Sequence, residues 1–244
     1  MVFALARTID EALALKEALG PEAIYGGGLT ALQLGWPDEV PGVPVVDVSE
    51  ADFGPLSQPI APGYLRLAAN ARLEALRLDP LVAERLPALR DLLGKLGAVG
   101  VRNLATLGGN LAWGLGDTEV LLAALGADLI YADGLNKPVD AALHDDGLLI
   151  AVDVHTARHA PHFVEKLGHR EAFSPARVVV AGCLRPGGWK VAARIGPTSL
   201  LVETLQHADE VETVFSHVEG PDPALLRIAR NLLHGHMTRL GDAP

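Results

Sequence analysis

The sequence contains a single cysteine, Cys183. One thiolate is too few for a disulfide framework, a four-cysteine zinc site or an iron–sulfur cluster held within this chain. A chain with so little cysteine is typical of a reducing compartment, so we expect a cytoplasmic location.

Positive charge is also scarce. The chain has 20 Lys and Arg against 30 Asp and Glu, which gives a net charge of −10. Nucleic acids and anionic membrane surfaces are bound by clustered Lys and Arg, so we expect neither as a partner. The N-terminal residues lack the basic and long apolar regions of a signal peptide. No run of 18 uncharged apolar residues occurs, so we expect no membrane insertion.

Familiar catalytic and nucleotide-binding motifs are missing. Without a G-x-S-x-G elbow or an H-E-x-x-H helix, the sequence offers no candidate catalytic residue. Neither G-x-G-x-x-G nor G-x-x-x-x-G-K-S/T occurs, which argues against a Rossmann fold and a P-loop. Pro161 would break any helix that put the neighbouring histidines on one face, so we expect no metal site. These histidines are His155, His159, His162 and His169.

The chain has 244 residues and is 49% hydrophobic, as a globular protein should be. Thr8 and Glu11 have the spacing of a capping box, which predicts the start of a helix. Pro87 marks a break within a longer helical pattern, and residues 55–62 look like a turn-rich boundary. We further expect helices at 71–76, 81–96, 118–125 and 223–237, and strands at 23–25, 43–48, 64–70, 127–134 and 148–154.

Residues 166–184, 187–196 and 211–218 predict an antiparallel sheet. Its first two strands are joined by the turn sequence Arg185-Pro186-Gly187-Gly188, which favours a hairpin. A polar connection at 155–163 separates this region from the rest, so the sequence predicts an α+β protein.

Two glycine segments share one design. Gly26-Gly27-Gly28 follows a strand, and Leu107-Gly108-Gly109-Asn110 interrupts an apolar run. Glycine admits positive φ and lets a ligand approach the backbone closely. Successive amides that point the same way can hold an anion such as a pyrophosphate. Two tight turns are the alternative, and the glycine pattern alone leaves both open.

The residues VRNLATLGGNLA (101–112) resemble the signature I-R-N-x-A-T-x-G-G-N-L-A. This is the signature of the FAD-binding medium subunits of molybdenum hydroxylases, the flavoprotein chains of xanthine dehydrogenase, carbon monoxide dehydrogenase and their relatives. YGGGLTAL (25–32), PLVAERLPAL (80–89) and EKLGHREAFSPARVVVAG (165–182) are similar to further segments of that family. The resemblance extends over residues 3–185.

The resemblance implies an α+β fold in three parts. Two subdomains, about 1–54 and 55–160, would form a FAD-binding domain of the vanillyl-alcohol-oxidase or PCMH type. Residues 161–244 would form a shortened C-terminal α+β domain with an antiparallel sheet and helices.

The same resemblance implies a FAD site without catalytic residues of its own. The side chains of Thr106 and Asn110 would donate to the pyrophosphate, and Glu119 would lie near the ribityl or ribose hydroxyls. Leu148 would pack on the isoalloxazine, and Lys166 would stabilise reduced flavin unless it is an ordinary surface lysine. Backbone amides would hold the pyrophosphate from Gly26, Gly27, Gly28, Leu29, Thr30, Leu107, Gly108, Gly109 and Asn110.

In function, the resemblance implies an electron-transfer subunit of an oxidoreductase. This subunit by itself would be inactive on substrate. A molybdopterin-binding large subunit would oxidise the substrate, and 2Fe–2S clusters on a small subunit would pass the electrons on. FAD would deliver these electrons to NAD+, a quinone or oxygen. A dimer of heterotrimers is a possible assembly of the three subunits.

Two alternatives stay open. Leu29 and Leu115 depart from the family pattern, and the C-terminal stretch of the family is missing. The first alternative is therefore a paralogue that binds FAD weakly or not at all and acts in assembly. The second alternative is a stand-alone flavin reductase of the same fold class.

Overall fold

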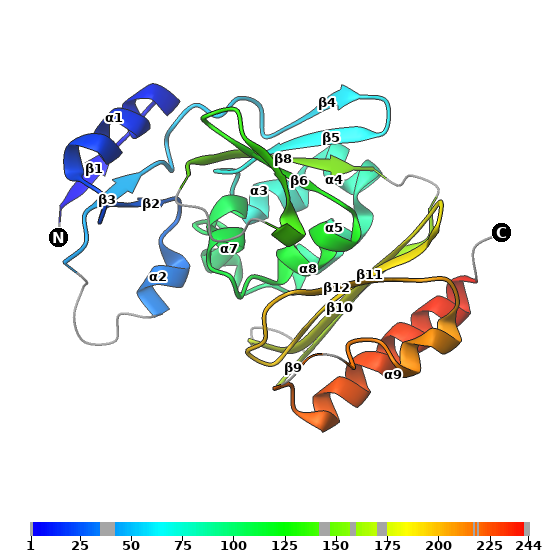
Figure 1. Ribbon diagram of the computed structural model, residues 1–244. Coiled ribbons are helices and arrows are strands. Elements are labelled where there is room, and N and C mark those ends of the chain that lie inside the picture. Colours follow the sequence, from blue (N-terminus) through cyan, green and yellow to red (C-terminus); the bar gives the residue numbers. More distant parts are fainter. Residues whose placement is uncertain are drawn as a thin grey trace.

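The computed structural model describes residues 2–34, 42–141, 147–156, 160–169, 175–216, 218 and 220–241. These residues form three sheets that follow one another along the chain (Figure 1). A small parallel sheet comes first, a five-stranded antiparallel sheet with short helices lies in the middle, and a four-stranded antiparallel sheet covered by a long helix comes last. The predicted α+β class is therefore confirmed.

The N-terminal unit is the parallel sheet, in the order β1-β3-β2, with one helix packed on it. Thr8 caps this helix as predicted, since its hydroxyl accepts the Glu11 amide at 3.1 Å. The Glu11 carboxylate accepts the amide of Arg7 rather than that of Thr8. The elements are β1 (Phe3–Leu5), α1 (Ile9–Leu19), β2 (Ile24–Gly26), α2 (Thr30–Leu34) and β3 (Val45–Asp47).

The middle sheet has the strand order β4-β5-β8-β6-β7. Its first strand corrects the expected turn-rich boundary at 55–62, because these residues form an edge strand paired with β5. Pro59 is tolerated there, since an edge strand needs no outward amide. The strands are β4 (Ser57–Ala61), β5 (Tyr64–Ala68), β6 (Asp128–Tyr131), β7 (Asn136–Pro138) and β8 (Leu149–His155), with a 3-10 turn, η1, at Val139–Ala141.

Short helices lie against this sheet and lead to the last one. The long helical pattern predicted for 81–96 divides at Pro87, which begins a new helix at a position where its missing amide is not needed. All eight residues of α8 are buried, because the helix also packs on β10 and β11 of the third sheet. The helices are α3 (Leu73–Leu78), α4 (Pro80–Arg85), α5 (Pro87–Gly94), α6 (Val99–Arg102), α7 (Leu107–Ala112) and α8 (Asp117–Ala124).

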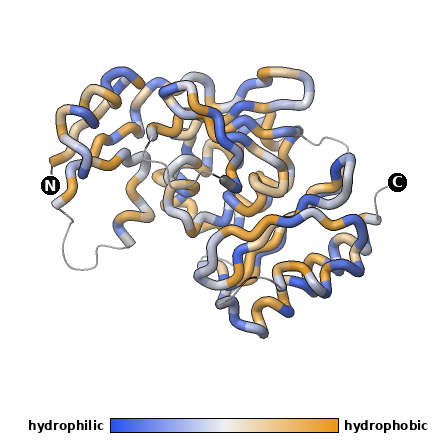
Figure 2. The backbone as a smooth tube through the Cα atoms, in the orientation of Figure 1, coloured by the Kyte–Doolittle hydropathy of each residue, from blue (hydrophilic) through white to orange (hydrophobic). Residues whose placement is uncertain are grey.

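The C-terminal sheet has the order β12-β11-β10-β9. The predicted hairpin is present, with Arg185 opposite Gly188. α9 buries residues four apart against the sheet, namely Leu225, Ala229, Leu233 and Met237. Figure 2 shows the hydrophobic stretches that run along these strands. The elements are β9 (His162–Gly168), β10 (Ala176–Arg185), β11 (Gly188–Ile195), β12 (Leu201–Leu205) and α9 (Pro223–Leu240).

The strand predicted at 211–218 was wrong. The chain forms a 3-10 helix there, η2 (Ala208–Glu212), followed by turns, and the fourth strand is β12 instead. Val211, Val214 and Phe215 are buried at spacings of three and four, which is a helical rather than an extended period. None of the described helices combines the length and the apolar character needed to cross a bilayer.

Candidate cofactor site

The two glycine segments lie directly against each other. A Cβ atom added at Gly27 would lie 2.3 Å from Oγ1 of Thr106. One added at Gly28 would lie 1.8 Å from the carbonyl oxygen of Leu104. Neither position has room for a side chain, so the loop after β2 and the segment before α7 form one continuous backbone surface.

The first loop presents free amides. Leu29 has a left-handed φ of 57°, and α2 begins at the next residue. No described residue accepts a hydrogen bond from the backbone amide of Gly27, Gly28, Leu29 or Thr30. Successive amides beside a left-handed residue form a concavity that suits an anion. The loop therefore fits the pyrophosphate of a dinucleotide cofactor.

The second loop uses its amides differently from the expectation. The amides of Leu107 and Gly108 donate to the carbonyl oxygens of Ala71 and Ala69 at 3.0 and 2.6 Å. An added Cβ at Gly108 would lie 3.0 Å from the Ala69 oxygen. This glycine thus lets α7 dock closely on the residues that follow β5.

The next two amides donate to Thr106, the residue that caps α7. The amide of Gly109 donates to the Thr106 hydroxyl at 3.1 Å, and that of Asn110 donates to the Thr106 carbonyl at 2.9 Å. All four amides expected to hold a pyrophosphate are engaged within the chain, because they anchor and cap a helix. What this segment can offer a ligand is side chains.

Two neutral side-chain donors remain at the second loop. Thr106 is buried over Gly27, and its hydroxyl keeps a hydrogen to donate while it accepts from Gly109. Asn110 accepts the amide and the hydroxyl of Thr118 at its Oδ1, at 3.3 and 2.5 Å, which leaves Nδ2 as a donor. Neutral donors of this kind would complement a phosphate held by the free amides of the first loop.

Glu119, expected beside ribityl or ribose hydroxyls, has a charged partner within the chain. The residue is 2% exposed and forms an ion pair with Arg194 of β11. The Arg194 guanidinium also donates to the Gly116 carbonyl at 2.8 Å. Burial lowers the pKa of Arg194, against the opposing effect of Asp117. The Glu119 carboxylate thus serves the contact between α8 and the C-terminal sheet.

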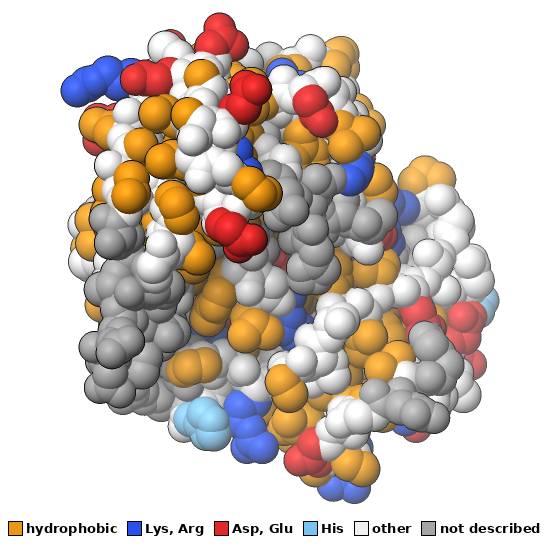
Figure 3. All heavy atoms as spheres, turned by 60° about the vertical axis from the view of Figure 1, so that its left-hand side comes forward, with side chains coloured by type: hydrophobic (Ala, Val, Ile, Leu, Met, Phe, Trp, Pro, Cys, Tyr) orange, Lys and Arg blue, Asp and Glu red, His pale blue; other side chains and the backbone are white. Residues whose placement is uncertain are grey.

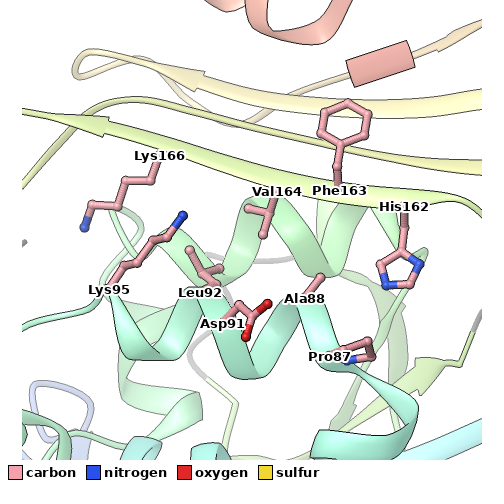
Figure 4. Close-up of a pocket in the computed structure, with 9 residues that line it drawn as sticks. All are labelled: Pro87, Ala88, Asp91, Leu92, Lys95, His162, Phe163, Val164 and Lys166. Carbon is pink, nitrogen blue, oxygen red and sulfur yellow. The ribbon is translucent and has the colours of Figure 1, made fainter. Parts of the chain in front are cut away.

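Lys166 is neither an unpaired flavin-facing cation nor a surface lysine. Its Nζ lies 2.6 Å from Oδ2 of Asp117, and the two side chains are 9% and 8% exposed. The pair joins β9 to α8. Figure 4 shows Lys166 and Lys95 at the same end of an open cleft of about 420 Å³ between α5 and β9.

Leu148 has no free face for a flavin ring. It is 3% exposed and belongs to the hydrophobic core of the N-terminal unit with Val46, Val48 and Ala51. Its carbonyl accepts the amide of Ala132 at 2.9 Å. The expected stacking partner is therefore a core residue.

Arg102, from the V-R-N part of the signature, is a buried residue that the sequence analysis did not assign. Its Nε lies 2.5 Å from Oε2 of Glu74, and its NH1 donates to the carbonyls of Leu96 and Gly97 at 3.0 and 2.8 Å. Hydrogen bonds from Arg77 and Arg102 lower the pKa of Glu74 from 4.5 to about 2. An arginine set among apolar residues was the available signal.

Exposed hydrophobic side chains flank the second loop in the sequence, and these too were not predicted. Figure 3 shows hydrophobic side chains gathered in a hollow beneath the N-terminal unit. Contiguous exposed apolar surface marks ligand-binding or protein-binding sites. The exposed large hydrophobic residues of this segment are Val99, Val101, Leu104, Trp113 and Leu115.

The histidines of the 155–169 region do not gather. His155 ends β8, where burial lowers its pKa, and His162 begins β9 with Nδ1 2.9 Å from the Ala160 carbonyl oxygen. His159 lies outside the described residues. Within the described ranges, no group of three or more His, Cys, Asp or Glu side chains could hold a metal ion.

Comparisons with known proteins agree with this architecture. The structure is similar to a chain of Cu,Mo-CO dehydrogenase in its cyanide-inactivated form, with 18% identity, a TM-score of 0.82, and coverage of 98% of this chain and 97% of that one. It is also similar to a chain of carbon monoxide dehydrogenase from Hydrogenophaga pseudoflava lacking the Mo-pyranopterin moiety, with 17% identity, a TM-score of 0.82, and 98% and 95% coverage. A search of curated proteins by sequence found no match.

A third similar structure is a chain of quinoline 2-oxidoreductase from Pseudomonas putida 86, with 19% identity, a TM-score of 0.80, and coverage of 98% and 96%. At such identities the similarity shows the fold. The sequence itself matches the family model "FAD binding domain in molybdopterin dehydrogenase" over residues 2–141, more than half of the chain. That match includes both glycine loops and confirms FAD as the cofactor of the family. The chain therefore belongs to the family of FAD-binding domains of molybdopterin dehydrogenases.

Proposed function

We propose that this protein is the FAD-carrying electron-transfer subunit of a molybdenum-containing hydroxylase in the cytoplasm. Bound FAD would supply a redox centre able to exchange one or two electrons. The observation that carries this proposal is the contact between the two glycine loops, where unengaged amides lie beside the side chain of Thr106.

The residues of this chain would bind and orient the cofactor. The amides of Gly27 to Thr30 would hold the pyrophosphate, with neutral donors from Thr106 and Asn110. Neutral donors suit a phosphate without adding charge to the chain. No general base is needed, because the chain only positions the redox group and excludes water from it.

The rest of the reaction would belong to other chains. With one cysteine, this chain cannot ligate a 2Fe–2S cluster, so electrons would come from clusters on a small partner subunit. Substrate would be oxidised on a molybdopterin-binding large subunit, and NAD+, a quinone or oxygen would be the acceptor. The isolated chain would then be inactive on substrate, and a dimer of heterotrimers would be its assembly.

We also propose the division of the chain at about residues 54 and 160. The three sheets support it, because the first ends at Asp47, the second runs from Ser57 to His155 and the third begins at His162. The two N-terminal units would bind FAD, and the C-terminal sheet would close on them through α8.

The experiment is purification of the chain followed by spectroscopy. We expect a yellow protein with the absorbance of an oxidised flavin, and FAD that stays with the protein through gel filtration. Co-expression with a molybdopterin-binding chain and an iron–sulfur chain should give a complex in which added substrate reduces the bound FAD. A colourless protein that takes up no added FAD would contradict the proposal.

A second candidate function is an assembly subunit without FAD. Two observations favour it: Leu29 replaces a polar residue of the family pattern, and the amides of Leu107 to Asn110 are engaged within the chain. In that case the purified chain would bind its partner subunits while remaining colourless. A stand-alone flavin reductase would be yellow but would show no binding to those partners.

A further inference from the structure

The side-chain amide of Asn110 has only one possible orientation. The backbone amide of Thr118 points at it from 3.3 Å, and a backbone N–H can only donate. The atom that faces Thr118 must therefore be Oδ1. With Oδ1 in that place, the Thr118 hydroxyl donates to the same oxygen at 2.5 Å. Nδ2, with its two hydrogens, is turned away from Thr118.

The connection between α7 and α8 wraps closely around Asn110. A Cβ atom added at Gly116 would lie 1.9 Å from the Asn110 carbonyl oxygen and 2.4 Å from its Oδ1. Only glycine fits there. Gly116 thus keeps Asn110 within reach of Thr118.

The C-terminal sheet holds this connection in place. Arg194 of β11 donates to the Gly116 carbonyl at 2.8 Å and pairs with Glu119. Lys166 of β9 pairs with Asp117 at 2.6 Å. Two buried cations thus match two buried carboxylates in the same turn of α8. Charges that are paired in this way make a rigid contact, because moving either element would leave a charge buried alone.

We infer that Thr118, Gly116 and Arg194 are positioning residues that fix the Asn110 amide with its Nδ2 toward the cofactor. The inference rests on the proposed function, in which Nδ2 of Asn110 donates to the FAD pyrophosphate. A flipped amide would instead turn Oδ1, an acceptor, toward the phosphate oxygens and repel them. Holding the donor in place before binding removes an ordering cost from the affinity.

The consequence is that FAD affinity depends on a sheet outside the FAD-binding family match. Arg194 follows the end of that match, residue 141, by more than fifty positions. Its guanidinium nevertheless reaches the segment that orients Asn110. The C-terminal unit therefore contributes to FAD binding by positioning the Asn110 side chain.

The test measures FAD affinity of the full chain, freed of flavin, by the change in flavin fluorescence during titration. Thr118→Val keeps the shape of the fully buried side chain but removes the hydroxyl. We expect it to raise the Kd for FAD by up to about tenfold, because Oδ1 of Asn110 keeps the backbone amide of Thr118 but loses its second hydrogen bond. Thr118→Ser keeps the hydroxyl and should bind within about twofold of the wild-type protein. Thr118→Ala serves in place of the valine variant if that one fails to fold.

A double-mutant cycle separates positioning from general stability. Asn110→Ala should weaken FAD binding, and adding Thr118→Val to it should have no further effect on Kd, because the residue to be oriented is gone. Arg194→Lys keeps the charge and loses the guanidinium contact to Gly116. It should also weaken FAD binding, again only when Asn110 is present.

The outcomes distinguish the inference from the function on which it rests. Wild-type protein that takes up no FAD overturns the proposed function. Normal FAD affinity in Asn110→Ala overturns the placement of Asn110. Weak binding in Asn110→Ala with normal binding in Thr118→Val overturns the inference, as does an equal loss from Thr118→Val in both backgrounds.

Discussion

A Cβ atom at Gly28 would lie 1.8 Å from the carbonyl oxygen of Leu104. The two residues are far apart in sequence, and their backbones touch where the loop after β2 meets the segment before α7. The contact brings the free amides of the first loop beside Thr106. Because a backbone oxygen cannot rotate away as a side chain can, this contact tolerates no substitution at Gly28.

Gly28→Ala should therefore separate the loops. We expect FAD affinity to fall at least tenfold and the free energy of unfolding to fall by about 1–3 kcal/mol, the usual cost of overpacking. Fluorescence titration and urea denaturation measure the two effects. Gly100→Ala is the matched control, since nothing lies within 4 Å of an added Cβ there. It should keep FAD affinity, and Gly28→Ala with wild-type affinity would show that the loops do not form the site.

Thr106 has two roles that one substitution can reveal. Its hydroxyl caps α7 by accepting the Gly109 amide, and it lies over Gly27 in the proposed site. Thr106→Val should lower the free energy of unfolding by about 1 kcal/mol through loss of the cap. It should also weaken FAD binding, whereas Thr106→Ser should preserve both properties. A valine variant that loses stability but keeps full FAD affinity would limit Thr106 to capping.

Glu119 should matter more for stability than for FAD binding. Glu119→Gln leaves the buried Arg194 without its partner, so we expect a loss of about 3–5 kcal/mol in the free energy of unfolding. The double variant Glu119→Gln with Arg194→Met should recover much of this loss, because no charge is then left buried alone. Denaturant titration measures both. FAD affinity of folded Glu119→Gln should fall no further than that of Arg194→Lys, because Glu119 acts on the site only by holding Arg194. A larger drop would favour the expected ribityl contact.

Glu74 should contribute a stability that depends on pH. Its pKa is lowered from 4.5 to about 2 by hydrogen bonds from Arg77 and Arg102, so folding favours the charged form. The contribution is complete above pH 4.5 and is lost as the pH falls from there toward 2. Denaturant titrations at pH 7 and pH 3 should show a larger fall in wild-type stability than in Glu74→Gln. Equal falls would mean that the carboxylate is not held by the two arginines.

The sequence alone determined features that depend on neighbours along the chain. Thr8 caps α1, Pro87 starts α5, and Arg185 and Gly188 close the hairpin, because capping, missing amides and turn chemistry are local. The signature around Gly108 also identified the family, since a long run of fixed residues is specific by itself.

Short edge strands were not predicted, because their formation depends on distant parts of the chain. β1, β4 and β12 have little internal pattern and depend on a partner strand that lies elsewhere in the sequence. The run at 211–218 has the composition of a strand, but its buried residues follow a helical period that only α9 and the sheet make favourable.

Only the tertiary structure decided what the polar site residues do. Lys166 is 49 positions from Asp117, and Glu119 meets an arginine from another sheet. A buried charge takes whatever partner the packing provides, and sequence spacing does not reveal that partner. The same holds for the amides of the second loop, which resemble a phosphate cradle in sequence but are used to anchor and cap α7. The docking and capping of α7 thus leave the free backbone donors to Gly27 and its neighbours.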